Sequence, residues 1–339
     1  MKKLFDVTKI GGTTIKNRFI RSATWEGMAD EEGHLTSELI DLYEKLAKGG
    51  VGLIISSYAT IFKYDKPSKR MLGLYDDSFI NEYKELTHKV HENNSKIIAQ
   101  LVLGNEFISS ESNKSYYGLD DSITDNDINE LKNAFVQAAL RCKEAGFDGG
   151  QIHGAHGYFL SRTVSPIYNK MNHGYGGSLD NRVKLIEEVY SHMRSALKDE
   201  FIISIKINSN DFEEGGATFE ECKKLCLNLD KLGIDFIEIS GNSNNELKGE
   251  GIYLDYAKEV AQSITTPVAL VGVNRSLDFM EEVIELTDIQ YISMCRPFIC
   301  EYDIVNKFEN GIKRKSRCVS CGKCVNNGKI NCILNLKDN

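Results

Sequence analysis

Short apolar runs and longer amphipathic segments alternate along most of this chain. The apolar runs are rich in Val, Ile and Leu. Few of them show the strict alternation of apolar and polar residues that is expected of a strand with one solvent-exposed face. Near-continuous apolar runs are typical of parallel strands that helices cover on the outside. The pattern predicts eight strands, at residues 17–23, 51–57, 96–103, 147–153, 201–208, 234–240, 267–273 and 289–296.

Helical periodicity fills the intervals between these strands, as in the segment TFEECKKLCLNLDKLG. Thr218 and Glu221 have the spacing of a capping box, and Gly146 and Gly233 stand where helices should end. Eight strand and helix alternations predict a (β/α)₈ TIM barrel, with an open doubly wound sheet as the alternative. We expect the barrel domain to cover residues 1–313, and the basic and then cysteine-rich residues 314–339 to form a C-terminal extension.

Composition and charge narrow the classes of partner. The 339 residues are 41% hydrophobic and 27% charged, which is ordinary globular material. A net charge of −8 argues against a nucleic-acid or anionic membrane surface, so a small-molecule partner is favoured. The first residues, MKKLFDVTKIGG, lack the apolar core of a signal peptide, and no apolar window reaches transmembrane length. The sequence therefore predicts a cytoplasmic protein.

The most informative chemistry lies directly behind the fourth predicted strand. His153, His156 and Tyr158 leave that strand together, within the segment QIHGAHGYFLSRTVSPIYNKMNHGYGGSLDNR. Their rings can donate hydrogen bonds and exchange protons, which suits binding of a carbonyl or another electron-poor group. A single histidine would be an ordinary interior residue, but the cluster favours a reaction site.

Active sites of TIM barrels gather at the carboxyl ends of the strands. Gln100 and Lys206 interrupt two otherwise apolar strands, IIAQLVL and ISIKIN. A buried lysine is costly unless an acceptor or an anionic ligand compensates its charge, so both residues are predicted to face a ligand. The other notable residues at or near strand ends are Ser22, Ala23, Thr24, Tyr58, Gly272, Cys295 and Arg296.

The last two predicted strands indicate a phosphate site. Barrels commonly hold a phosphate in the loops after strands seven and eight, where this chain has VGVN and CRP. Gly272 would let backbone N–H groups approach the phosphate, and Arg296 would supply a charged guanidinium group that can donate two parallel hydrogen bonds. The sequence thus favours a cofactor that carries a phosphate.

The histidine segment closely resembles the signature of the old yellow enzyme family of FMN-dependent NAD(P)H oxidoreductases. KNRFIRSA near the start, GHLT at residues 33–36 and VGLII at residues 51–55 agree in the same order. The resemblance implies an FMN-containing barrel that passes hydride from NAD(P)H, through flavin N5, to an electron-poor acceptor such as an activated alkene. His153 and His156 would bind the acceptor's oxygen, and Tyr158 would protonate the adjacent carbon.

The same resemblance implies roles for the strand-end residues. Gln100 would bond the pyrimidine side of the flavin, and Lys206 would stand beside flavin N1 and O2. The phosphate would be held by Gly272, Cys295 and Arg296. The ring would be bordered by Ser22, Ala23 and Thr24, with Tyr58 near its edge. Two departures stand out, since LVLGNEF follows Gln100 in place of a segment with His, Gly and Arg, and Trp25 occupies a position that tunes flavin O4 in relatives.

The C-terminal extension carries a dense array of thiols with the spacing C-x₂-C-x₂-C-x₇-C. Cys318, Cys321, Cys324 and Cys332 could bind a [4Fe–4S] cluster or a structural zinc, or could be a remnant without a ligand. The array resembles the cluster segment after the barrel in the 2,4-dienoyl-CoA reductase and trimethylamine dehydrogenase branch. Those relatives continue into further domains, so a cluster here would need a separate electron-transfer partner.

Two other functions fit parts of the sequence. Lys206 could form a Schiff base in an aldolase-type barrel, and the tail cysteines could serve a redox sensor that does not catalyse. The joint presence of Gln100, His153, His156, Lys206 and Arg296 favours the flavin site over both. The sequence leaves open the acceptor, the choice between NADH and NADPH, and whether the chain forms a homo-oligomer.

Overall fold

A closed barrel of parallel strands forms the centre of the computed structural model, which describes residues 1–241 and 249–336. The first strand of the barrel pairs with the last one and with the second one, which closes the ring. The TIM barrel is therefore confirmed, and the open sheet is excluded. The barrel strands are β3 (Phe19–Arg21), β4 (Leu53–Thr60), β6 (Lys96–Val102), β9 (Gly149–Gly154), β10 (Ile202–Asn208), β11 (Phe236–Ser240), β12 (Val268–Leu270) and β13 (Tyr291–Met294).

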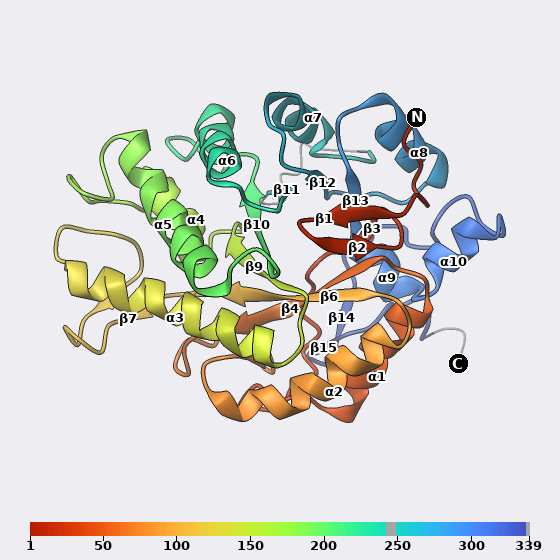
Figure 1. Ribbon diagram of the computed structural model, residues 1–339, viewed down its shortest axis with the longest axis horizontal. Coiled ribbons are helices and arrows are strands. Elements are labelled where there is room, and N and C mark those ends of the chain that lie inside the picture. The colour runs from red at the N-terminus through yellow and green to blue at the C-terminus, as the bar shows by residue number, and fades with distance from the viewer. Residues whose placement is uncertain (242–248, 337–339) are drawn as a thin grey trace.

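Helices surround this barrel and cover its apolar outer face (Figure 1). The long ones are α1 (Ser37–Lys48), α2 (Ile80–His91), α3 (Asp125–Glu144), α5 (Leu179–Leu197), α6 (Phe219–Leu232), α7 (Leu254–Ser263) and α8 (Leu277–Leu286). The short ones are η1 (Asp77–Phe79), α4 (Phe159–Val164), α9 (Arg296–Cys300) and α10 (Ile304–Glu309). The short additional strands are β5 (Leu72–Gly73), β7 (Phe107–Ile108) and β8 (Ser115–Tyr116).

Local sequence signals set several helix ends as predicted. Thr218 and Glu221 form a reciprocal capping box at the start of α6. Gly233 ends that helix in the left-handed conformation, with φ +86°, which a glycine adopts without steric cost. Gly146, with φ +82°, follows the end of α3 in the same way.

An apolar plug closes the amino-terminal end of the barrel. The hairpin of β1 (Thr8–Ile10) and β2 (Thr13–Ile15) buries Ile10 and Ile15 completely, against apolar side chains from the barrel strands. The hairpin was not predicted, although the two glycines between its strands are a known turn signal. Because this end is filled, polar side chains and ligand space are left to the carboxyl ends of the strands.

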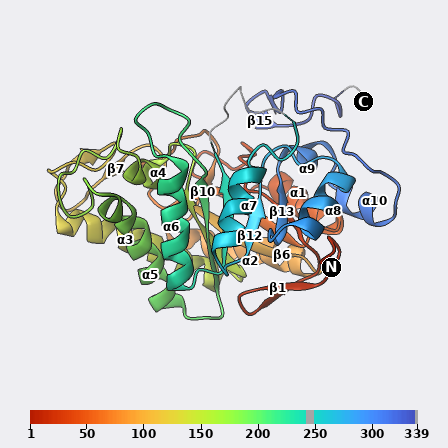
Figure 2. The same ribbon diagram turned by 90° about the horizontal axis from the view of Figure 1, so that it is seen from above.

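The cysteine-rich tail packs over the opposite end of the barrel from the β1–β2 hairpin (Figure 2). Its small ribbon pairs β14 (Val325–Asn326) with β15 (Lys329–Ile330), and Ile330 N donates a 2.8 Å hydrogen bond to Glu26 O. The proposed boundary after residue 313 stays a prediction. None of the helices in the described ranges is long and apolar enough to span a bilayer.

Candidate active site

The two histidines of the central segment meet at the end of β9. Their ring centroids lie 5.1 Å apart, with the planes nearly perpendicular at 85°. His153 is buried, and its Nδ1 accepts a 3.4 Å hydrogen bond from the Ala155 amide. In the neutral ring the proton therefore resides on Nε2. His156 adopts a left-handed backbone, with φ +63°, and its Nε2 lies 2.9 Å from Ser240 Oγ on β11.

Both imidazoles are held neutral by their surroundings. Burial, and then the charges of His156 and Lys206, lower the pKa of His153 well below its usual range. Desolvation by the surrounding protein, and then the Lys206 charge, also lower the pKa of His156, although this residue is more exposed to solvent than His153. Because neither ring carries a charge near pH 7, each can act as a neutral hydrogen-bond donor.

Tyr158 joins the histidines, as its place in the sequence suggested. Its ring centroid lies 4.9 Å from that of His153 and 5.6 Å from that of Tyr58, which comes from β4. The Tyr58 hydroxyl is 2.7 Å from Ser68 Oγ. Burial is the main reason that the pKa of each phenol is raised. Both hydroxyls therefore keep their protons at neutral pH.

Lys206 is almost fully buried, and the protein itself supplies its counter-charge. The Nζ atom donates a 2.7 Å hydrogen bond to Ser22 Oγ and lies 3.2 Å from Glu238 Oε2. Lys206 and Glu238 are partners in the register of β10 and β11, and Glu238 is 0% exposed. The sequence interpretation missed Glu238, although it interrupts an apolar strand just as Lys206 does.

Gln100 belongs to the same buried network. Its Nε2 donates a 2.7 Å hydrogen bond to Gln151 Oε1, and Gln151 Nε2 donates one of 3.1 Å to Glu238 Oε2. Ser293 Oγ on β13 donates a 2.5 Å hydrogen bond to the other oxygen of Glu238. Hydrogen bonds thus connect side chains from opposite parts of the barrel, as expected for buried polar groups.

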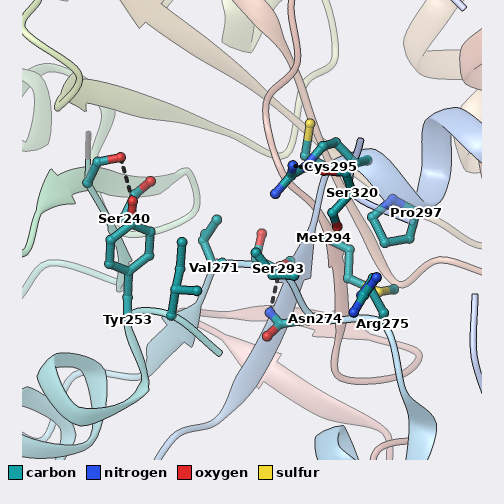
Figure 3. A pocket seen from close by; sticks show the side chains of 15 residues that line it. Ser240, Tyr253, Val271, Asn274, Arg275, Ser293, Met294, Cys295, Pro297 and Ser320 are labelled. Carbon is teal, nitrogen blue, oxygen red and sulfur yellow. Dashed lines mark hydrogen bonds between the residues drawn. The ribbon is translucent and has the colours of Figure 1, made fainter. Parts of the chain in front are cut away.

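A cavity of about 190 Å³ opens at the carboxyl ends of β11, β12 and β13 (Figure 3). Gly272, Cys295 and Arg296 line it, as the predicted phosphate site requires. Gly272 has φ +114°, and a Cβ at this position would lie 2.7 Å from Ile252 Cγ1. The close approach of the chain therefore needs a glycine here.

Two guanidinium groups lie at this cavity, and sequence analysis identified one of them. Arg296 Nη1 makes a long contact of 3.5 Å with Ser320 O, and Arg275 Nη1 makes one of 3.4 Å with Cys318 O. Arg275 also lies 3.4 Å from a carboxylate oxygen of Glu250. Paired guanidinium groups beside a tight backbone turn are suited to a phosphate group. The signal for Arg275 was its position directly after VGVN.

The remaining predicted residues of the first strand lie at the same end of the barrel. Thr24 Oγ1 is 3.0 Å from Ser22 O and 3.1 Å from Cys295 Sγ, so it connects the end of β3 with the cavity. Ala23 is half-buried. Trp25 donates a 3.0 Å hydrogen bond from its indole to Lys69 O. The structure therefore places the predicted flavin residues at the carboxyl-terminal end of the barrel, while their roles stay predictions.

The tail cysteines take different positions. Cys318 and Cys332 are each 7% exposed and pack with Ile299 and Cys300, whereas Cys324 is half-buried and Cys321 is exposed. Among residues 1–241 and 249–336, no three His, Cys, Asp or Glu side chains are grouped so that they could hold a metal ion. The metal site of the tail therefore stays a prediction.

Comparison with known proteins gives a consistent result across nearly the whole chain. The model of a family described as NADH:flavin oxidoreductase / NADH oxidase matches residues 3–315. An NADH oxidase of Thermoanaerobacter brockii is 29% identical, over 98% of this chain and 56% of that protein. A cinnamate reductase of Clostridium sporogenes is 26% identical, over 98% of this chain and 57% of that protein.

Among solved structures, a 2-naphthoyl-CoA reductase in complex with 2-naphthoyl-CoA superposes with a TM-score of 0.83 at 24% identity. The superposition covers 91% of this chain and 52% of that one. This likeness supports the barrel fold. The chain spans about half the length of these three proteins.

Proposed function

Since the chain belongs to the NADH:flavin oxidoreductase / NADH oxidase family, we propose that it uses FMN to reduce an electron-poor acceptor with NAD(P)H. The membership confirms the resemblance seen in the sequence, and it supports an NAD(P)H:flavin-dependent oxidoreductase as the proposed enzyme class. Our proposal adds noncovalent FMN and an activated alkene as the class of acceptor. When bound, FMN accepts hydride from the nicotinamide and passes it to the acceptor.

The cavity beside Gly272 carries the proposal, because its chemistry fits the phosphate of FMN. Arg275 and Arg296 approach it from the loops after β12 and β13, and their contacts with tail carbonyls are long. Guanidinium donors are therefore available for an anion. The turn at Gly272 has no side chain that would keep an anion from the backbone. Cys295 lines the same cavity.

The polar side chains at the top of the barrel fit the ring of the same cofactor. Gln100 offers an amide that can complement a pyrimidine edge, and Lys206 offers a positive charge. A positive charge near the pyrimidine edge stabilises a reduced, anionic flavin. Ser22, Ala23, Thr24 and Tyr58 are proposed to border the ring.

The histidine pair is proposed to bind the acceptor. His153 carries its proton on Nε2 and is neutral, so it can donate to an acceptor oxygen without being deprotonated first. His156 is oriented by Ser240 and can supply a second donor. Two donors aimed at a developing enolate oxygen stabilise its charge. Tyr158 keeps its proton and stands beside His153, so it can act as the general acid.

The two rival functions receive less support. A Schiff base needs a lysine amine that is free to attack a carbonyl, whereas Lys206 Nζ is engaged by Ser22 and Glu238, so these contacts do not favour an aldolase. A redox sensor would need no pair of neutral histidines at the barrel top. A small-molecule substrate therefore remains the proposed partner.

We also propose that the chain divides into a barrel of residues 1–313 and a tail of residues 314–339. The proposed ligands of a [4Fe–4S] cluster or zinc in the tail are Cys318, Cys321, Cys324 and Cys332. This proposal rests on the spacing of the cysteines in the sequence, since the described residues show no group of three metal-binding side chains, and we propose no electron path through the tail.

Reconstitution with FMN tests the proposed function. We expect one FMN to bind, with a flavin absorbance spectrum that bleaches under anaerobic NADH or NADPH and returns when an activated alkene is added. Riboflavin, which lacks the phosphate, is the matched ligand and should bind at least about tenfold more weakly, since a charge-assisted phosphate contact contributes about 1.5–3 kcal/mol. An Arg296→Ala variant should lose most of this preference.

A protein that stays colourless with FMN, or takes no electrons from either nicotinamide, would sink the proposal. Equal affinity for FMN and riboflavin would show that the cavity beside Gly272 does not hold the phosphate.

A further inference from the structure

We propose that Glu238 is a positioning residue, which fixes both the amide orientation of Gln100 and the charge balance around Lys206. The inference rests on the proposed FMN site. Glu238 is fully buried on β11, and its two oxygens receive contacts from three neighbouring side chains. Lys206 and Gln151 share Oε2, and Ser293 binds Oε1.

The orientation of Gln100 follows from what a carboxylate can do. A carboxylate paired with a lysine accepts hydrogen bonds and cannot donate them. The Gln151 side chain must therefore turn its NH₂ group toward Glu238, at 3.1 Å, which leaves its oxygen for Gln100. Gln100 in turn directs its NH₂ group at Gln151, at 2.7 Å. One negative charge thus sets the direction of two amides in succession.

The consequence is a defined acceptor at the ligand end of this chain of amides. Gln100 Oε1 accepts no hydrogen bond from any residue in the described ranges. It is therefore free to accept one from a ligand, and it complements a ring N–H such as the imide N–H of a pyrimidine. An amide at position 238 could keep its oxygen toward Lys206 and Gln151, which both need an acceptor there, so the direction of Gln100 would survive that change. Loss of the bond between Gln151 and Glu238 would release it.

The same carboxylate sets the net charge beneath the ring. The Lys206 ammonium has three N–H groups, and Ser22 and Glu238 engage two of them. The pair carries no net charge, so only part of the lysine's field reaches a neighbouring ligand. Removal of the negative partner would leave more positive potential, and a reduced flavin, being more anionic, would gain more from it than the oxidised form.

Variants that divide this network can test the proposal. Glu238→Gln removes the charge and can keep an acceptor toward Gln151, whereas Gln151→Leu disturbs the amides alone. Ser204→Ala is the matched control, because this buried serine of β10 has a hydroxyl without a hydrogen-bond partner in the described ranges. Each protein is loaded with ¹⁵N-labelled FMN. The first measurement is the ¹⁵N chemical shift of flavin N3, the imide nitrogen that would face Gln100. The second is the midpoint potential of the bound flavin. Compared with the potential of free FMN, it gives the ratio of affinities for reduced and oxidised FMN.

For Glu238→Gln we expect the ratio of affinities to shift about tenfold toward reduced FMN relative to the wild type, which corresponds to a rise of about 30 mV for a two-electron couple. Gln151→Leu should move the N3 resonance, with less than half of the change in potential. Ser204→Ala should match the wild type in both. An unchanged potential in Glu238→Gln would overturn the inference, and so would an equal change in Ser204→Ala.

Two further outcomes are also decisive. If Glu238→Gln does not fold, the double variant Lys206→Met/Glu238→Met removes both charges with apolar replacements, which buried pairs often tolerate. Its affinity ratio should shift toward oxidised FMN, because the Lys206 charge near the ring is lost together with that of Glu238, and a shift toward reduced FMN would overturn the charge argument. A Gln151→Leu protein with an unmoved N3 resonance would overturn the amide argument. Wild-type protein that binds no FMN would instead contradict the proposed function.

Discussion

The top of the barrel and the cysteine tail both carry reactive side chains, but their side chains are held in different ways. At the barrel top, Lys206, Glu238 and Gln100 are buried and joined by hydrogen bonds. In the tail, Cys318 and Cys332 pack as small apolar groups beside Ile299. The described part of the chain thus fixes the first set through polar contacts and the second set through packing.

The difference follows from the cost of burial. An unpaired buried charge is strongly destabilising, so a barrel with a lysine inside it must also provide the partner. A free thiol behaves as a small hydrophobe and needs no partner when buried. Folding therefore determines the geometry of the barrel top closely, while thiol positions in the tail are left to packing or to a ligand.

The histidine pair gives the largest expected effect. We expect His153→Ala/His156→Ala to keep FMN bound but to slow the oxidation of the reduced enzyme by the acceptor about 100-fold or more, because proton-handling and donor groups typically contribute that much. Stopped-flow absorbance follows this half-reaction, and the flavin spectrum reports occupancy. His88→Ala, an exposed position on α2, is the control.

A His156→Asn variant should retain part of the rate, since asparagine still donates a hydrogen bond. Parallel loss of FMN and turnover in the double variant would show that the pair is structural. The histidines at the barrel top would then resemble the tail cysteines, which are held by packing.

A medium effect is expected on stability at acid pH. The folded protein holds the pKa of His153 far below the value near 6.5 of an unfolded chain, so below pH 6.5 the unfolded state binds more protons. Stability contributed by this site is complete above pH 6.5 and is lost as the pH falls, by up to about 1.4 kcal/mol per pH unit. Urea unfolding between pH 7 and pH 5 measures this slope.

His153→Asn should remove that part of the slope, because asparagine does not titrate. Identical slopes in the variant and the wild type would mean that the imidazole takes up its proton in the folded protein as easily as in the unfolded one.

The smallest effect on the barrel is expected from the tail. Cys321 is exposed, so Cys321→Ser removes a proposed metal ligand without disturbing packing. After anaerobic treatment with iron and sulfide, or with Zn²⁺, the wild type should retain metal and the variant should not. FMN affinity should change less than about twofold, or about 0.4 kcal/mol. Cys226→Ser, in the buried face of α6, is the control for metal content.

Failure of the wild type to retain either metal would show that the tail thiols are packing residues. A large loss of FMN affinity in Cys321→Ser would instead show that tail and barrel act as one site.

Local pattern was sufficient for the barrel and for part of its chemistry. Apolar runs identified every barrel strand, because a strand covered by helices must be apolar along its length. The seventh predicted strand, residues 267–273, was longer than β12, because the chain leaves the sheet at Val271 to form the turn at Gly272. Gln100 and Lys206 were found because polar residues are rare in such runs.

The contacts that complete the site depend on residues distant in sequence. Lys206 meets Glu238 only because β10 and β11 pair in one register, and Arg275 meets the tail only after the tail folds back over the barrel. No local period reports such pairs. Glu238 itself could have been found by the rule that identified Lys206, but its partner could not have been named before the strands were aligned.

The backbone at His156 also bears on how the site can change during evolution. Its φ of +63° lies in a region where glycine, asparagine, aspartate and histidine are well represented and branched or bulky residues are rare. The conformation therefore limits replacements at this position to a short set of small or polar side chains. Within that set asparagine keeps a donor, so we expect exchange between imidazole and amide to alter the range of acceptors while the backbone, and the proposed FMN site beneath it, stay as they are.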